Sequence, residues 1–237
     1  MNSCSIVSIF GVLLQKEFLI AVRSADRLAA SMFLAFIIAL MLTFGVSSTF
    51  LGPRYVRVLS PTLVWSCVFI IAAVLGERGF DSELKNKAFE GVVLSRTSLT
   101  AVFFSKVFIT FLQLFISLIL VVLTIDGTLA TRTSAMLFVT WPVVFLTLFS
   151  FSCLTVLIGG ATAVSQLRSV LFPTLLLPNV FPLYLACIEL TNMQVARSQV
   201  VGVAAPTDLS FWWLLLILTA SIHGIIGALL YPFVVKG

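Results

Sequence analysis

The chain has 237 residues, of which 60% are hydrophobic and only 10% are charged, and its mean hydropathy is +1.19. A water-soluble domain carries roughly 25% charged residues, so this chain has too little polar surface to cover a soluble particle. The hydrophobic content also excludes a disordered chain, and four cysteines are too few to staple a small disulfide-rich domain. We therefore expect lipid to be the main solvent.

The first element expected along the chain is an amphipathic helix over residues 5–27. Apolar residues recur there at helical spacing, while Lys16, Arg23 and Arg27 share a different face. We interpret this segment as a helix lying on the inner membrane surface. The alternative is a plain basic flank that only sets the topology. The charges and the long apolar run that follows do not fit a cleaved signal peptide.

Six long apolar runs follow, each close to the ~20 residues that a helix needs to cross a bilayer. In lipid only helices and closed barrels satisfy every backbone group, and these runs lack the alternation of barrel strands. Gly52-Pro53, Asp126-Gly127 and Ala205-Pro206 provide turn residues between runs. We predict an all-α membrane protein with one transmembrane domain over residues 1–237 and six spanning helices: 28–50, 59–76, 107–125, 134–158, 171–190 and 211–235.

The basic residues predict the orientation of these helices. With the N-terminus inside, ten of the 14 basic residues are cytoplasmic, and only Arg54, Arg57, Arg132 and Arg197 lie outside. Under the positive-inside rule both termini are then cytoplasmic. We therefore interpret the net charge of +5 mainly as a topology signal. No polar segment alternates basic residues with aromatic residues that could stack on bases, which argues against nucleic-acid binding.

Residues 77–98 form the one long polar stretch on the predicted cytoplasmic side. Asp81 with Lys85, and Glu83 with Lys87, are acid–base pairs four residues apart, each of which stabilises a helix by roughly 0.2–0.5 kcal/mol. We predict a short amphipathic helix between the second and third spans, suited to the groove of a soluble partner. The alternative is a solvated loop whose charges keep it out of the bilayer.

The fifth run is unusual because Pro173, Pro178, Asn179 and Pro182 lie inside one predicted span. Each proline removes a backbone donor, so we expect a kinked or interrupted helix whose freed carbonyls need partners. Such breaks lie beside substrate pathways in transporters, and the alternative is a packing kink. Glu189 is expected at the membrane boundary, where a charge costs least.

Other candidate sites are weaker. His223, inside the last run, is either a ligand or proton relay or a neutral packing residue. The chain has no P-loop motif, no paired-cysteine motif and no catalytic or metal-binding group within a predicted span. We therefore predict that the chain is not an enzyme and that it holds no metal or resident cofactor.

Several short motifs recur in a characteristic order and spacing: Lys16–Leu19 with Arg23, Leu59–Trp65, Gly76–Phe80, Phe89–Ser95, Ser105–Val107 and the proline-rich fifth run after Arg168. In this order and spacing they resemble the haem exporter protein B (CcmB) family, whose fold is similar to that of compact six-helix ABC permeases. The chain departs from the family pattern at Asn86-Lys87, where the family has D-G, and at Arg96, where it has proline.

The resemblance implies a membrane subunit of an ABC-type complex for c-type cytochrome biogenesis in the bacterial inner membrane. The implied partners are a cytoplasmic ABC ATPase, haem-handling membrane proteins and a periplasmic haem chaperone, with a homodimer expected by analogy. ATP would act only through the ATPase, and haem is the implied cargo. Because no axial haem ligand is evident, we expect this chain to convert ATPase motion into helix rearrangement that serves haem delivery or release of the loaded chaperone.

The amphipathic 77–98 segment and the prolines of the fifth run also lead us to expect roles for particular residues. The surface that couples to the ATPase would comprise Glu77, Arg78, Phe80, Glu83, Phe89 and Glu90. The moving helix or substrate pathway would involve Pro173, Pro178, Asn179, Pro182 and Glu189. Two alternatives stay open: the permease of an ABC exporter for another substrate, such as a glycan, a lipid or a drug, and a membrane scaffold that transports nothing.

Overall fold

The structure is a computed structural model that describes residues 6–23, 25–46, 52–80, 98–131, 133–163, 165, 167–198 and 209–236. All regular secondary structure in these ranges is helical. The helices are α1 (Ile6–Arg23), α2 (Ala25–Gly45), α3 (Pro53–Arg78), α6 (Leu99–Leu129), α7 (Thr133–Val139), α8 (Trp141–Thr162), α9 (Arg168–Ser198) and α10 (Leu209–Lys236).

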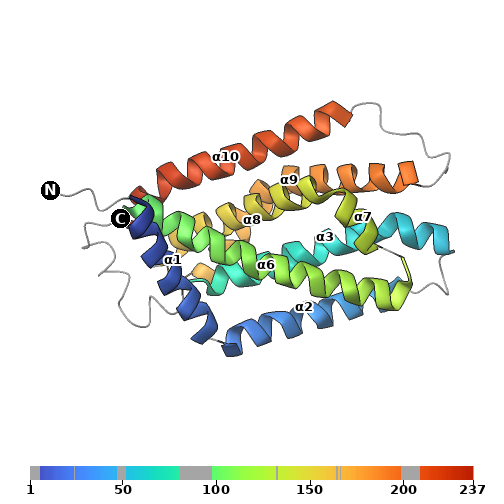
Figure 1. The fold of residues 1–237 in the computed structure, drawn as a ribbon, viewed down its shortest axis with the longest axis horizontal. Helices are drawn as coiled ribbons and strands as arrows, with labels where there is room; N and C mark the ends of the chain where they lie inside the picture. The colour runs from blue at the N-terminus through green and yellow to red at the C-terminus, as the bar shows by residue number, and fades with distance from the viewer. Residues whose placement is uncertain are drawn as a thin grey trace.

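The long helices lie side by side along one axis and alternate in direction (Figure 1). Helix α1 is oblique to the others and lies across one end, where α3 ends and α6 begins. We call this the α1 end of the bundle, and the opposite end, where α6 ends and α7 lies, the α7 end. In the predicted orientation the α1 end faces the cytoplasm.

Five helices among the described residues are long and apolar enough to cross a membrane: α3, α6, α8, α9 and α10. A further apolar segment, Ala29–Gly45 of α2, is shorter, and it packs against α3 and α6. The chain is therefore a multi-pass membrane protein. Each of these five helices contains most of one predicted span, and the sixth span stays a prediction.

Helix α8 forms the centre of the bundle. It contacts α3, α6, α9 and α10, and 78% of its spanning window is buried, against 28% for α10. A helix that is apolar on every face can be covered by neighbours on every face, which explains this position. Its small residues, including Gly159 and Gly160, allow close approach of α3 and α10.

The predicted span 134–158 is not one helix, because the chain breaks at Thr140 between α7 and α8. Pro142, in the first turn of α8, lacks the backbone N–H that a continuous helix would use there. The hydropathy of the run gave no sign of the break.

The turn predicted at Asp126-Gly127 is also displaced. Both residues are still helical, α6 ends at Leu129, and the chain turns at Ala130, whose φ is 50°. The Asp126 carboxylate instead accepts hydrogen bonds from the backbone N–H groups of Thr133 (2.6 Å) and Ser134 (2.9 Å). It therefore caps the start of α7.

The N-terminal segment is helical, but not over the whole predicted range of 5–27. Helix α1 ends at Arg23 and α2 begins at Ala25, so Arg27 belongs to α2. Helix α1 packs against the start of α6 and leaves Phe18 exposed. Its placement on the membrane surface stays a prediction.

Candidate functional site

The charged groups at the α1 end form a buried ion pair between α1 and α6. Glu17 and Lys106 are only 8% and 7% exposed, and Glu17 Oε2 lies 3.5 Å from Lys106 Nζ. The other carboxylate oxygen, Oε1, lies 3.3 Å from Nζ of the less buried Lys16. One carboxylate thus forms ion pairs with two ammonium groups. Because an unpaired buried charge is costly, this pairing holds α1 against α6.

The end of α3 joins the same cluster through Phe80. Lys106 Nζ lies 4.9 Å from the centre of the Phe80 ring, within the range of a cation–π contact. Phe80 itself is 2% exposed. The chain just after α3 therefore contacts α6 through the Phe80–Lys106 pair. Because Lys106 also pairs with Glu17, the same cluster includes α1.

Glycines let Phe80 and α3 lie close against α8. A Cβ added at Gly159 would be 3.0 Å from the carbonyl oxygen of Gly76 and 3.0 Å from Phe80 Cε2. Both contacts are tighter than ordinary van der Waals separation. Gly76 is similarly close to Thr155 of α8 and to Phe172 of α9. A larger side chain at either glycine would require the neighbouring groups to shift, so the glycines allow the end of α3 to lie against the centre of the bundle.

The predicted coupling residues are described only in part. Glu77 is half-buried near the end of α3, and Arg78 is the last residue of that helix. Phe80 is buried, so in this structure its ring contacts the bundle and is not on a free surface. Glu83, Phe89 and Glu90 lie outside the described residues. The coupling surface therefore stays a prediction, and the structure describes where it begins.

The proline-bearing helix α9 is continuous from Arg168 to Ser198, so of the two predicted forms, a kinked or an interrupted helix, the interruption is not found. Pro178 and Asn179 are exposed, and Asn179 Nδ2 donates to the Leu175 carbonyl of its own helix at 2.8 Å. The remaining residues of the predicted moving helix are half-buried: Pro173, Pro182 and Glu189. The structure does not bring these residues together around one point, and their role stays a prediction.

Helix α9 is joined to α3 by two hydrogen bonds between side chains. Trp65 Nε1 donates to Thr191 Oγ1 at 3.1 Å, and Ser66 Oγ lies 2.6 Å from Tyr184 Oη. Trp65 is fully buried. The helix that leads to the predicted coupling segment is therefore also the helix that holds α9.

His223 has a partner from a neighbouring helix. Its Nδ1 lies 2.6 Å from Ser150 Oγ of α8, and both residues are buried. Across the part of the chain that the structure describes, no three His, Cys, Asp or Glu residues are grouped to hold a metal ion. The role of His223 stays a prediction.

The pairing of Glu17 with Lys106 was not predicted from the sequence. Lys16 and Lys106 contribute there to the predicted topology and, with Glu17, to the family motifs. The available signal was a carboxylate within a basic amphipathic segment and a lysine directly before an apolar run. Three of the quoted motif segments, containing Lys16–Glu17, Phe80 and Lys106, meet at this one end of the bundle.

Comparison with protein-family models gives a match to the CcmB protein family over residues 8–234, nearly the whole chain. The chain belongs to the CcmB family. This family provides a membrane component of the haem exporter ABC system in cytochrome c maturation and is not an enzyme family. It functions with an ABC ATPase, CcmA, which is a separate chain. A search of curated proteins gave no match.

Proposed function

We propose that this CcmB-family chain couples a cytoplasmic ABC ATPase to haem delivery, or to release of a haem-loaded periplasmic chaperone, in the bacterial inner membrane. In this proposal α2 is the sixth span, both termini are cytoplasmic and α1 lies on the inner membrane surface. The ATPase docks on the 77–98 segment. Haem-handling membrane proteins, the chaperone and a second copy of this chain complete the assembly.

The observation that carries the proposal is the position of α3. One end of α3 leads into the 77–98 segment and is fixed by Phe80 against Lys106 and α8. The middle of α3 is bonded to α9 through Trp65 and Ser66. A helix of 26 residues is ~39 Å long, so α3 connects the start of the 77–98 segment with both of these contacts. A push on the 77–98 segment would therefore reach both the α1–α6 contact and α9.

Docking is tested by co-purifying the chain with its ATPase after charge reversal in the 77–98 segment. Phe89→Asp combined with Glu90→Lys should abolish the association, because it removes an apolar contact and inverts a charge. Arg57→Glu is the matched control, since Arg57 is exposed toward the α7 end of α3. It should leave the association intact. Unchanged co-purification of the double variant would contradict docking at this segment.

Energy coupling is tested separately from docking. An ATPase partner that binds ATP but cannot hydrolyse it should assemble with this chain and yet fail to support c-type cytochrome formation. The measurement is haem staining of c-type cytochromes in membranes that contain equal amounts of the complex. Normal cytochrome levels with the inactive ATPase would favour the scaffold alternative over coupling.

A further inference from the structure

The α1 end of the bundle has an apolar cluster of its own, separate from the main core, and it includes three aromatic rings. Phe80 follows α3, Phe103 belongs to α6 and Tyr231 to α10, and each is at most 2% exposed. The ring centres of Phe103 and Tyr231 are 5.3 Å apart. The cluster therefore joins the beginning of the 77–98 segment to the last turns of α10.

One glycine of α8 faces rings from both of these elements. A Cβ added at Gly160 would lie 3.2 Å from Tyr231 Cε2 and 3.6 Å from Phe80 Cζ. On α10, a Cβ added at Gly227 would fall on the Phe103 ring. Phe80 and Tyr231 thus pack at the same point of α8. Because packed side chains leave little free volume between them, the position of one ring limits that of the other.

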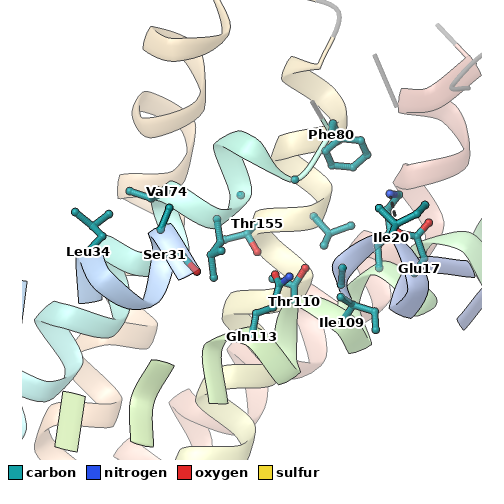
Figure 2. Close-up of a pocket in the computed structure, with 17 residues that line it drawn as sticks. Glu17, Ile20, Ser31, Leu34, Val74, Phe80, Ile109, Thr110, Gln113 and Thr155 are labelled. Carbon is teal, nitrogen blue, oxygen red and sulfur yellow. Dashed lines mark ion pairs between the residues drawn. The ribbon is translucent and has the colours of Figure 1, made fainter. Parts of the chain in front are cut away.

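Open space adjoins the Phe80 ring. Phe80 lines a cavity of about 120 Å³ at the α1 end, together with Ile20 of α1, Ile109 of α6 and Thr155 of α8 (Figure 2). This volume is several times the ~10–15 Å³ that one water molecule needs, and close-packed interiors contain few such voids. The Phe80 ring therefore has room to leave its contact at Gly160 without separation of the helices.

The end of α10 is weakly tied to the rest of its own helix. The spanning window of α10 is the least buried of the five, at 28%. Pro232 lies inside the helix next to Tyr231 and has no N–H, so the Ala228 carbonyl lacks the hydrogen bond that a continuous helix would supply. The middle of α10 is held to α8 by the 2.6 Å hydrogen bond between His223 Nδ1 and Ser150 Oγ. The last turns are therefore free to move more than the middle.

We propose that the end of α10 is a second moving element of this chain, controlled by Phe80 through its contact with Tyr231 at Gly160. The inference rests on the proposed function, because the displacement of Phe80 begins with an ATPase docked on the 77–98 segment. When Phe80 shifts into the cavity, Tyr231 loses a neighbour and the turn around Pro232 loosens. Tyr231 is a positioning residue in this step, and α10 joins α9 among the helices that the push reaches.

The test is amide hydrogen exchange, measured by mass spectrometry on the complex of the full-length chain with an ATPase that binds ATP but cannot hydrolyse it. Exchange in residues 229–234 should rise roughly tenfold when ATP binds, a size typical of coupling between two sites. Residues 211–219, at the other end of α10, should not change. If residues 74–80 respond to ATP and 229–234 do not, this inference is overturned and the proposed function stands. No response in either region overturns both.

Three variants test the path without depending on any one of them to fold. Gly227→Ala pushes α10 away from Phe103, so exchange in 229–234 should be high with and without ATP. Gly224→Ala is the matched control, because its Cβ would lie 3.5 Å from Phe149, an ordinary contact, and the ATP response should persist. Pro232→Ala restores the backbone donor and adds no bulk, so exchange should stay low in both states and c-type cytochrome formation should fall. A full ATP response in Pro232→Ala would overturn the proposal.

Discussion

The two ends of the bundle use charged side chains in opposite ways. At the α7 end, Asp126 bonds to backbone groups only seven and eight residues away and shapes a single turn. At the α1 end, Glu17 and Lys106 are far apart in sequence, and their pairing joins two helices. The first charge organises local chain geometry, and the second contributes to tertiary packing.

This difference follows from burial. The Asp126 carboxylate is only half-buried, so water molecules can form some of its hydrogen bonds if its protein partners are removed. Glu17 and Lys106 are almost fully buried, so the loss of either leaves a charge without adequate solvation. We therefore expect changes at the α1 end to affect the whole bundle and changes at the α7 end to stay local.

The largest effect is expected for Lys106→Met. This change leaves the buried Glu17 with only the more exposed Lys16, and it should lower the free energy of unfolding by about 3 kcal/mol. Combining Lys106→Met with Glu17→Gln should restore much of the loss, because no buried charge remains unpaired. Unfolding midpoints in a mixed-micelle denaturant series measure both. The matched control is Lys16→Met, which should cost about 1 kcal/mol or less because Lys16 is partly exposed. Equal losses for the two lysines would contradict a buried pair between α1 and α6.

A smaller effect is expected from adding one methyl group at either end. Gly159→Ala would force its Cβ against the Gly76 carbonyl and the Phe80 ring, and it should destabilise the bundle by about 1–3 kcal/mol. Gly127→Ala at the α7 end meets no atom within 4 Å, and it should stabilise α6 by about 0.5–1 kcal/mol. Opposite signs in the same unfolding assay are the expected result. A neutral Gly159→Ala would mean that α3 and α8 are free to separate at this point.

The sequence predicted the helices well where hydropathy alone decides them. The apolar run 107–125 lies within α6, but α6 extends from Leu99 to Leu129, because the charges of Lys106 and Asp126 end a charge-free run without ending the helix. The break at Thr140 was missed for a related reason, since Pro142 lies inside an apolar run. Hydropathy indicates which residues are apolar, but it does not indicate where a backbone hydrogen bond is absent.

The candidate site was predictable only as a set of separate segments. The motifs containing Glu17, Phe80 and Lys106 are visible in the sequence, but their meeting depends on how α1, α3 and α6 pack. Contacts of this kind are found only once the neighbouring helices are in place.

The smallest effect is expected for Asp126→Ala. The variant removes the acceptor for two backbone N–H groups at the start of α7, and it should cost about 1 kcal/mol, as loss of a helix cap does. Amide hydrogen exchange should rise in Thr133–Val139 and stay unchanged in α1, because Asp126 touches neither α1 nor α6 near Lys106. Asp126→Asn keeps one carbonyl acceptor and should produce about half of the increase. Faster exchange in α1 would show that the two ends are energetically linked, and the separation between a local and a tertiary use of charge would then fail.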